Sequence, residues 1–163
     1  MELVADSSQS SIADARELLL EYGRFVSSQS APAQFCFGSL EKEAAGLPAS
    51  YLDQGGGSLL AYKGNLHVGF VAWRALPSTV APSAWEMKRL WVRSEARGAG
   101  LGRKLTLAVI RRARGANRTA IYLDTVPASM GTAYRLYLDL GFRHCPPYNG
   151  NTMDGIAFLS LSL

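Results

Sequence analysis

The sequence predicts one α/β domain over residues 1–163, with a mixed sheet that carries helices on both of its faces. Three observations predict it. Apolar residues recur with a helical period in some segments and alternate with polar residues in others. The resulting order is β-α-α-β-β-β-α-β-α-β-β, which is typical of helices and strands that share one core. A chain of 163 residues, 48% of them apolar, is long enough to bury such a core.

The N-terminal part of the chain is predicted to be mainly helical. Residues 2–5 form a candidate first strand, and Ser11 with Asp14 resembles a capping box at the start of a helix. That helix should end near Ser27. One of its faces is apolar, at Ile12, Ala15, Leu19, Tyr22 and Val26. A shorter helix is predicted over residues 39–45.

The middle of the chain is predicted to form three strands. Residues 58–63 and 66–76 are two of them, and Gly64-Asn65 between them is a hairpin turn signal. His67 lies just beyond this turn, so we expect it to face solvent without a chemical role. After a loop, the next strand covers residues 85–93. These segments therefore predict a hairpin followed by one further strand.

The C-terminal half is predicted to alternate between helices and strands. A helix over residues 101–114 follows a glycine-rich turn, and a strand over 119–126 comes next. Pro127 begins another helix, which Gly141 ends. Two closing strands are predicted from residue 142 onward, at 142–145 and 156–163.

Composition excludes several classes of protein. No apolar run approaches the length of a membrane span, and the N-terminus carries early acids without the basic region of a secretory signal. We therefore expect a cytoplasmic protein with no membrane partner. Cys36 and Cys145 lie far apart without metal-ligand spacing, so we expect reduced structural thiols and no metal.

The net charge of +4 is concentrated in one segment, because ten lysines and arginines lie between residues 88 and 118. A basic segment can bind nucleic acid, but no nucleic-acid motif or interleaved aromatic platform accompanies this one. An anionic cofactor accounts for part of the charge. Arg111, Arg112 and Arg114 have a simpler explanation, since cations in the last turn of a helix favour its dipole. We expect no nucleic-acid partner.

A strand, a glycine-rich turn and a helix follow one another around Gly98, Gly100 and Gly102. This arrangement is a phosphate-binding device, because backbone amides and the positive end of the helix dipole face the turn. A dinucleotide fingerprint would need a third glycine where Arg103 stands, and the P-loop motif is absent. An oxidoreductase that binds a dinucleotide is therefore disfavoured.

The segment RGAGLG, from Arg97 to Gly102, fits the R/Q-x-x-G-x-G/A signature of the GNAT N-acetyltransferase superfamily. The preceding EMKRLWVR, the triplet LDT at 123–125 and the pattern A-x-x-L-Y-x-x-x-G-F from Ala133 to Phe142 resemble the same family. The resemblance implies a mixed, mostly antiparallel central sheet flanked by helices on both faces, and acetyl-CoA as the acyl donor. It also implies cofactor-binding residues, some of them at a bulge in the strand that precedes the turn. They are Leu90, Trp91, Val92, Arg97, Gly98, Ala99, Gly100, Leu101, Gly102 and Arg103.

Three further phrases resemble a small, single-domain, bacterial-type subgroup of this family. They are LLLEYGRF, FCFGSLEKEAAGLPASY and GFRHCPPYNGN. With them the resemblance covers most of the chain. It does not carry over a substrate, because members of that subgroup are mostly assigned by similarity.

Two residues are candidates for catalysis. Glu86 stands eleven residues before Arg97, which resembles the position of a glutamate base in the family. Three roles stay open for it: base, substrate anchor, or ion-pair partner of Lys88 on the same strand face. Tyr137 holds the L-Y position, which implies the general acid that protonates the leaving thiolate. Met130 stands where many family members have an asparagine that contacts the cofactor, so that contact is missing.

The sequence thus predicts an acetyl-CoA-dependent N-acetyltransferase. It would move an acetyl group to a primary amine of a small molecule, or to an exposed amino group, by direct attack in a ternary complex. The alternative is a non-catalytic module of the same fold that binds or senses acyl-CoA, and a nucleic-acid-binding domain is a third hypothesis. A homodimer, the acyl chain length and the identity of the acceptor amine are left open.

Overall fold

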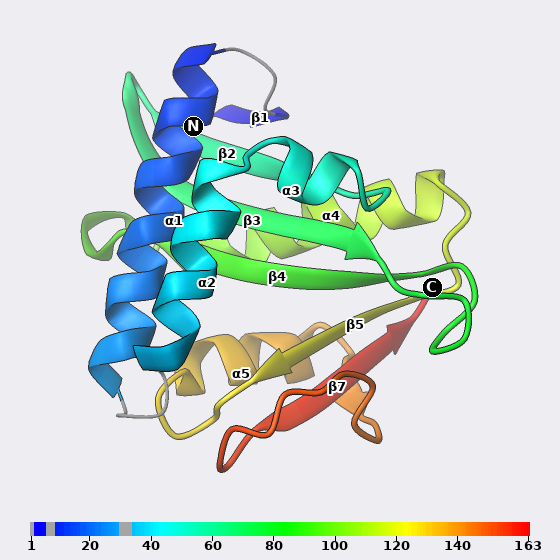
Figure 1. The fold of residues 1–163 in the computed structure, drawn as a ribbon. Coiled ribbons are helices and arrows are strands. Elements are labelled where there is room, and N and C mark those ends of the chain that lie inside the picture. Colours follow the sequence, from blue (N-terminus) through cyan, green and yellow to red (C-terminus); the bar gives the residue numbers. More distant parts are fainter. Residues whose placement is uncertain (1, 6–8, 30–33) are drawn as a thin grey trace.

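The computed structural model describes residues 2–5, 9–29 and 34–163 of the chain. Figure 1 shows how the helices and strands within these ranges are arranged. In chain order they are β1 (Glu2–Ala5), α1 (Gln9–Gln29), α2 (Gln34–Ala45), α3 (Ala49–Leu52), β2 (Gly57–Lys63), β3 (Leu66–Ala75), β4 (Ala84–Val92), the 3-10 helix η2 (Ser94–Ala96), α4 (Leu101–Gly115), β5 (Ala120–Thr125), α5 (Gly131–Asp139), β6 (Arg143–His144) and β7 (Ala157–Ser162). The predicted order of strands and helices is confirmed, with the short helices α3 and η2 added.

The described strands form one sheet in the order β1-β2-β3-β4-β5-β7-β6. Neighbouring strands are antiparallel except for β4 and β5, which run parallel. That parallel pair is short, because it joins only residues 84–86 to residues 120–122. Beyond Glu86 and Tyr122 the two strands separate, as Figure 1 shows. The predicted mixed, mostly antiparallel sheet is confirmed, and it is split between β4 and β5.

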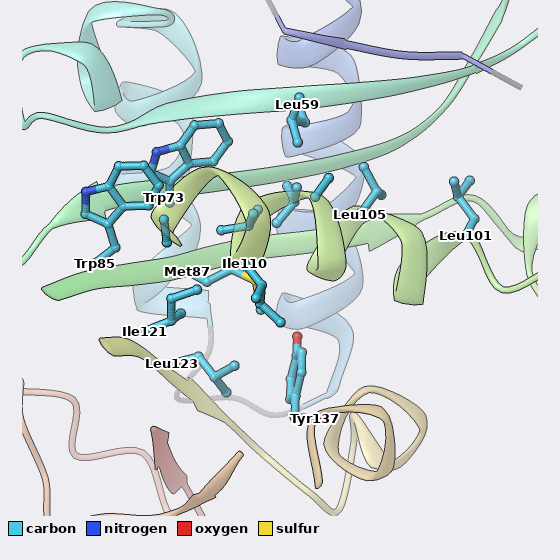
Figure 2. Packing of buried hydrophobic residues seen from close by; sticks show 14 of the residues in the cluster. Leu59, Trp73, Trp85, Met87, Leu101, Leu105, Ile110, Ile121, Leu123 and Tyr137 are labelled. Carbon is cyan, nitrogen blue, oxygen red and sulfur yellow. The ribbon is translucent and has the colours of Figure 1, made fainter. Parts of the chain in front are cut away.

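Helices cover both faces of the sheet, as predicted (Figure 1). One apolar core lies between the sheet and the helices α4 and α5, and it includes Trp85, Leu105, Ile121 and Tyr137 (Figure 2). A second core lies between the other face and the helices α1, α2 and α3. Alternation along the strands explains both cores, because successive side chains point to opposite faces.

A β-bulge interrupts the pairing of β4 with β3. Ala72 pairs with Lys88 and Phe70 pairs with Trp91, so β4 has one residue more than β3 in this interval. Within the bulge Arg89 takes a left-handed conformation, with φ of 60°. Non-glycine residues rarely adopt this conformation, so the surrounding contacts must hold Arg89 in place.

The bulge reverses which side chains of β4 face which core. Before it, Met87 packs in the core beneath α4, whereas Lys88 points to the other face. After it, Leu90 packs against the same core as Met87, and Trp91 packs against the α1 side. One extra residue shifts the alternation by one position. The bulge thereby places Lys88 and Arg89 together on the α1 side.

Some predicted helix boundaries are wrong. Helix α1 begins at Gln9, so Ser11 lies within its first turn and is not its cap. Helix α2 begins at Gln34, five residues earlier than predicted. Helix α5 begins at Gly131 and not at Pro127, because the amide of Met130 first closes a turn onto the carbonyl of Val126.

The expectation that His67 faces solvent is also wrong. Its side chain is only 14% exposed, because α1 lies over β3 at this point. His67 Nδ1 lies 3.2 Å from Asp14, and its Nε2 lies 3.0 Å from Glu17. Cys145 is a free thiol, and the side chain of Cys36 lies outside the described part. No helix within the described ranges combines the length and apolar character needed to cross a membrane.

Candidate active site

A cleft of about 520 Å³ opens where β4 leaves β5, and we call it the main cleft. Its walls are the end of β4, the glycine-rich turn, the start of α5, and Tyr22 and Phe25 of α1. The structure brings nine of the ten predicted cofactor residues together in these walls. They are Leu90, Trp91, Val92, Arg97, Gly98, Gly100, Leu101, Gly102 and Arg103. Ala99, the tenth, is exposed and does not line the cleft.

The glycine-rich turn presents unpaired backbone amides to the main cleft. Gly98 and Gly100 have φ angles of 80° and 72°, which glycine adopts without strain. Gly100 is the N-cap of α4, and a glycine has no side chain with which to cap this helix end. The first amides of a helix have no partner within the helix, so those of α4 are free to bind a ligand. This donor set fits the pyrophosphate of a coenzyme.

Trp91 forms a side wall of the main cleft and is held by several contacts. Its indole nitrogen donates to Glu21 at 3.1 Å, and the Arg97 guanidinium lies over its ring at 4.9 Å. Arg97 also donates through Nε to the carbonyl oxygen of Val92 at 2.9 Å. Phe25 also packs against Trp91, with ring centroids 5.2 Å apart. The wall is therefore ordered by residues of α1 whose place at the site the sequence analysis missed.

The predicted acid, Tyr137, lies behind the main cleft. Ala133 and Leu136 of the same helix line the cleft, whereas Tyr137 is 6% exposed and belongs to the core. Figure 2 shows its ring rising from α5 with the hydroxyl directed toward the sheet. Burial raises the pKa of Tyr137, so its hydroxyl stays protonated at neutral pH. Tyr134 points elsewhere, and its hydroxyl lies 2.9 Å from His144 Nε2.

The predicted carboxylate, Glu86, is 1% exposed and lines neither the main cleft nor any other hollow described here. Four donors surround it, among them the predicted partner Lys88. Its carboxylate accepts from Arg74 at 2.6 Å, Lys88 at 3.4 Å, Tyr148 at 3.1 Å and Asn149 at 3.2 Å. Burial alone would raise the pKa of Glu86, but Lys88 and Arg74 outweigh it and hold that pKa below its ordinary value. Such a carboxylate is ionised and a weak base.

A second carboxylate, which the sequence analysis did not assign, stands on the other side of the split. Asp124 of β5 accepts through Oδ2 from Asn149 at 2.9 Å and from Asn151 at 3.1 Å. Its other oxygen, Oδ1, accepts no hydrogen bond from the part of the chain that the structure describes. Asp124 belongs to the triplet LDT, and the two asparagines belong to the phrase GFRHCPPYNGN. The resemblance of these two phrases to the family was therefore the only sequence feature that could have pointed to this carboxylate.

A second hollow, of about 320 Å³, lies on the α2 side of the sheet, and we call it the cationic hollow. Its walls come from α2, α3, β3 and β4. They are Ser39, Lys42, Glu43, Ser50, Tyr51, Gln54, Arg74 and Lys88. The sequence analysis did not predict it, because its basic residues come from three separate segments.

Much of the basic segment is committed to contacts within the chain. Arg93 pairs with Glu17 at 2.6 Å and Glu21 at 2.7 Å. Arg112 lies over the Trp73 ring and Arg118 over the Trp85 ring. These contacts place the arginines against aromatic faces and acids of the fold, which explains part of the charge without a nucleic acid. In the described ranges, no cluster of histidine, cysteine and acidic side chains could hold a metal ion.

A split sheet with a glycine-rich turn and a helix N-terminus at the split is an arrangement that suits a phosphorylated cofactor. Residues 14–142 match the family model described as "Acetyltransferase (GNAT) family". The chain belongs to this family.

Two curated rat proteins are similar to the chain. N-acetyltransferase 8F1 is 36% identical over 107 residues, which are 64% of this chain and 47% of that protein. N-acetyltransferase 8B is 33% identical over 130 residues, which are 76% of this chain and 57% of that protein. The chain thus spans about half the length of the curated relatives it matches. Both relatives are eukaryotic, so they give no support to the bacterial-type subgroup.

Solved structures share the fold at low sequence identity. A Streptococcus agalactiae acetyltransferase has a TM-score of 0.76 at 18% identity, covering 99% of this chain and 98% of that chain. PaiA N-acetyltransferase from Thermoplasma acidophilum, solved in complex with coenzyme A, has a TM-score of 0.70 at 13% identity, with all of both chains covered. These likenesses show that the fold is that of GNAT acetyltransferases.

Proposed function

We propose that this chain transfers an acetyl group from acetyl-CoA to the primary amine of a small molecule or to an exposed amino group. The observation that carries the proposal is the main cleft itself. It joins the uncapped start of α4 at one end to the bulge of β4 and the split in the sheet at the other. A phosphate-binding end and an opening between two strands suit a long cofactor and a second substrate that meet inside the protein.

The donor end of the cleft would hold acetyl-CoA through the chain's own amides and cations. The amides at the start of α4 would bind phosphate oxygens, and Arg97 and Arg103 would add positive charge. When bound, acetyl-CoA supplies the acetyl group as an activated thioester. Met130 also lines this cleft, with its sulfur 3.8 Å from the Thr125 hydroxyl, where many family members offer an asparagine.

Direct attack by the amine suits the side chains that line the cleft. The described cysteine, Cys145, is not among them, and burial raises the pKa of its thiol, which disfavours the nucleophilic thiolate. At the bulge, Leu90 and Trp91 would offer backbone amides to the oxygen on which negative charge develops. Tyr137 would hold a proton on its phenol oxygen for the leaving thiolate.

The two carboxylates at the split suit different tasks. Glu86 has its oxygens occupied by four donors, so its contacts favour the ion-pair role over that of a base. Asp124, which like Glu86 lines neither the main cleft nor the cationic hollow, keeps Oδ1 open, and we infer that this oxygen receives or orients the acceptor amine. Glu86 would then act as a positioning residue that holds Lys88, Arg74 and the loop carrying Asn149.

A thiol-release assay with acetyl-CoA and a panel of primary amines tests the proposal. We expect thiol release that depends on the amine, and loss of release in Gly100→Ala. The alternative is a non-catalytic module that binds or senses acyl-CoA. It predicts that acetyl-CoA raises the melting temperature while no amine in the panel releases thiol. That result would replace the proposed function with the alternative.

A further inference from the structure

We propose that the acceptor carries an anionic group beside its amine, and that the cationic hollow binds this group. The inference rests on the proposed function and names its substrate class: amines with a carboxylate or a similar oxyanion, such as amino acids. Three basic side chains, Lys42, Arg74 and Lys88, line a hollow of about 320 Å³. This volume suits a small charged group and not a protein segment.

The acidic residue in the wall of the hollow is already neutralised. Glu43 accepts two hydrogen bonds from Arg89, at 3.1 Å and 3.0 Å, and a further one from the Tyr51 hydroxyl. Burial alone would raise the pKa of Glu43, but Arg89 outweighs it and holds that pKa below its ordinary value. Glu43 is therefore ionised and paired with Arg89. It forms no ion pair with Lys42 or Arg74 among the described contacts.

The cations of the hollow outnumber the acids that they contact. Glu86 lies behind the wall and takes one contact from Arg74 and one from Lys88. Lys42 has no acidic partner in the part of the chain that the structure describes. Four cations, with Arg89 included, therefore face the carboxylates of Glu43 and Glu86, the charge of Asp124 also acts on Lys88, and one positive charge is left in excess. Asp124 does not line the hollow and is bound by two asparagine amides.

Partial burial makes the charge of Lys88 unusual, whereas Lys42 at the rim of the hollow is exposed. The Lys88 side chain is 17% exposed, and burial lowers the pKa of its ammonium group. Holding the Lys88 cation in such a place costs desolvation free energy, which a bound anion would offset. Ser50 and Gln54 in the same walls are held by hydrogen bonds within the chain, from the Ser50 hydroxyl to the carbonyl oxygen of Glu43 and from Arg74 to the side-chain oxygen of Gln54.

The cationic hollow also lies at the correct place for an acceptor. Lys88 lines the hollow and Trp91 lines the main cleft, and both side chains lie on the α1 side of the sheet, three residues apart on β4. Three residues of a strand span roughly 10 Å. An amine that reaches the main cleft could therefore keep an anionic group, a few bonds away, in the hollow.

The test compares amino acids with their own carboxamides, which lack only the negative charge. Rates with acetyl-CoA are expressed per mole of unprotonated amine, so that the different amine pKa values cancel. We expect kcat/KM to favour the acid by at least about tenfold, the equivalent of one charge-assisted hydrogen bond. In Lys42→Glu this ratio should fall to one or below. Lys63→Gln, which removes an exposed cation at the end of β2, should leave the ratio unchanged.

A binding measurement separates this inference from the proposed function. N-acetylated amino acids cannot react, and they should raise the melting temperature of the wild type but not of Lys42→Glu. If amines are acetylated without any preference for the acid, the anion site is wrong and the proposed function stands. If no amine is acetylated but N-acetyl amino acids still bind through Lys42, the proposed function fails and the anion site stands. Absence of both preference and binding overturns the inference.

Discussion

Glu86 and Asp124 accept hydrogen bonds from the same amide group, Nδ2 of Asn149, at 3.2 Å and 2.9 Å. Their strands, β4 and β5, are paired up to Glu86 and then separate, so Asn149 bridges the start of the split. The two carboxylates nevertheless differ. Glu86 is enclosed by four donors, whereas Asp124 has one oxygen that the described residues leave open. Because Glu86 and Asp124 have different surroundings, we expect their substitution to have different effects.

Replacing Asp124 with asparagine should affect turnover more than folding. If Oδ1 receives the amine proton, kcat/KM at neutral pH should fall by about 10²–10⁴-fold, the usual range for acid–base catalysis. The loss should shrink as the pH approaches the pKa of the amine, about 10.4 for an alkylamine, because free amine is then abundant. A pH–rate profile of wild type and Asp124→Asn measures this. A loss of equal size at every pH would show that Asp124 does not receive the proton.

Replacing Glu86 with glutamine should affect stability and its dependence on pH. Because the pKa of Glu86 is lowered in the folded protein, ionised Glu86 stabilises the fold above its ordinary pKa of about 4.3. This stabilisation is lost as the pH falls through the lower folded-state pKa. Glu86→Gln should therefore be less stable at pH 7, and its stability should decline less steeply below about pH 4.5. Urea unfolding at a series of pH values tests this, with Asp124→Asn as the comparison.

Local patterns were enough to predict most of the fold. The glycine-rich turn, the hairpin at Gly64 and the order of helices and strands along the chain all follow from nearby residues. The bulge in β4 came from family resemblance, because nothing in the alternation of EMKRLWVR marks Arg89 as a residue with positive φ. The short helix α3 was missed because four residues carry no periodic signal.

The candidate site was only partly predictable, because its contacts join distant segments. The residues of the glycine-rich turn are contiguous, and all but Ala99 line the main cleft. The bond from Tyr148 to Glu86 spans 62 positions, and the pairing of Arg89 with Glu43 spans 46. Sequence spacing carries no information on such contacts. The cationic hollow could not be foreseen for the same reason.

Replacing Gly100 with alanine should weaken acetyl-CoA binding without a clash. A Cβ at this position would meet no atom within 4 Å, but φ is 72°, which costs an L-residue about 1–2 kcal/mol. We expect a small drop in melting temperature and a much smaller upward shift on addition of acetyl-CoA. The matched control is Gly115→Ala at the other end of α4, where space is also open and φ is not positive. It should keep the full shift, and equal loss in both variants would contradict the role of the turn.

Replacing Tyr137 with phenylalanine should separate catalysis from folding. The Tyr137 hydroxyl makes no hydrogen bond with the described residues, and its ring packs against Phe142 with centroids 5.8 Å apart. Phenylalanine keeps that packing, so the melting temperature should hardly change. If the hydroxyl protonates the leaving thiolate, kcat should fall by about 10²–10⁴-fold with acetyl-CoA binding retained.

Tyr134→Phe is the matched control, because its hydroxyl has a structural partner in His144 at 2.9 Å. Losing that hydrogen bond should lower stability by up to about 1 kcal/mol, and turnover should stay close to that of the wild type. The two tyrosines are thus expected to respond in opposite ways, one in kcat and the other in melting temperature. Steady-state kinetics and thermal unfolding of both variants measure this. Full activity in Tyr137→Phe, or equal losses of kcat in both variants, would contradict the acid role of Tyr137. Tyr137 would then be a core residue, and the leaving thiolate would take its proton from solvent.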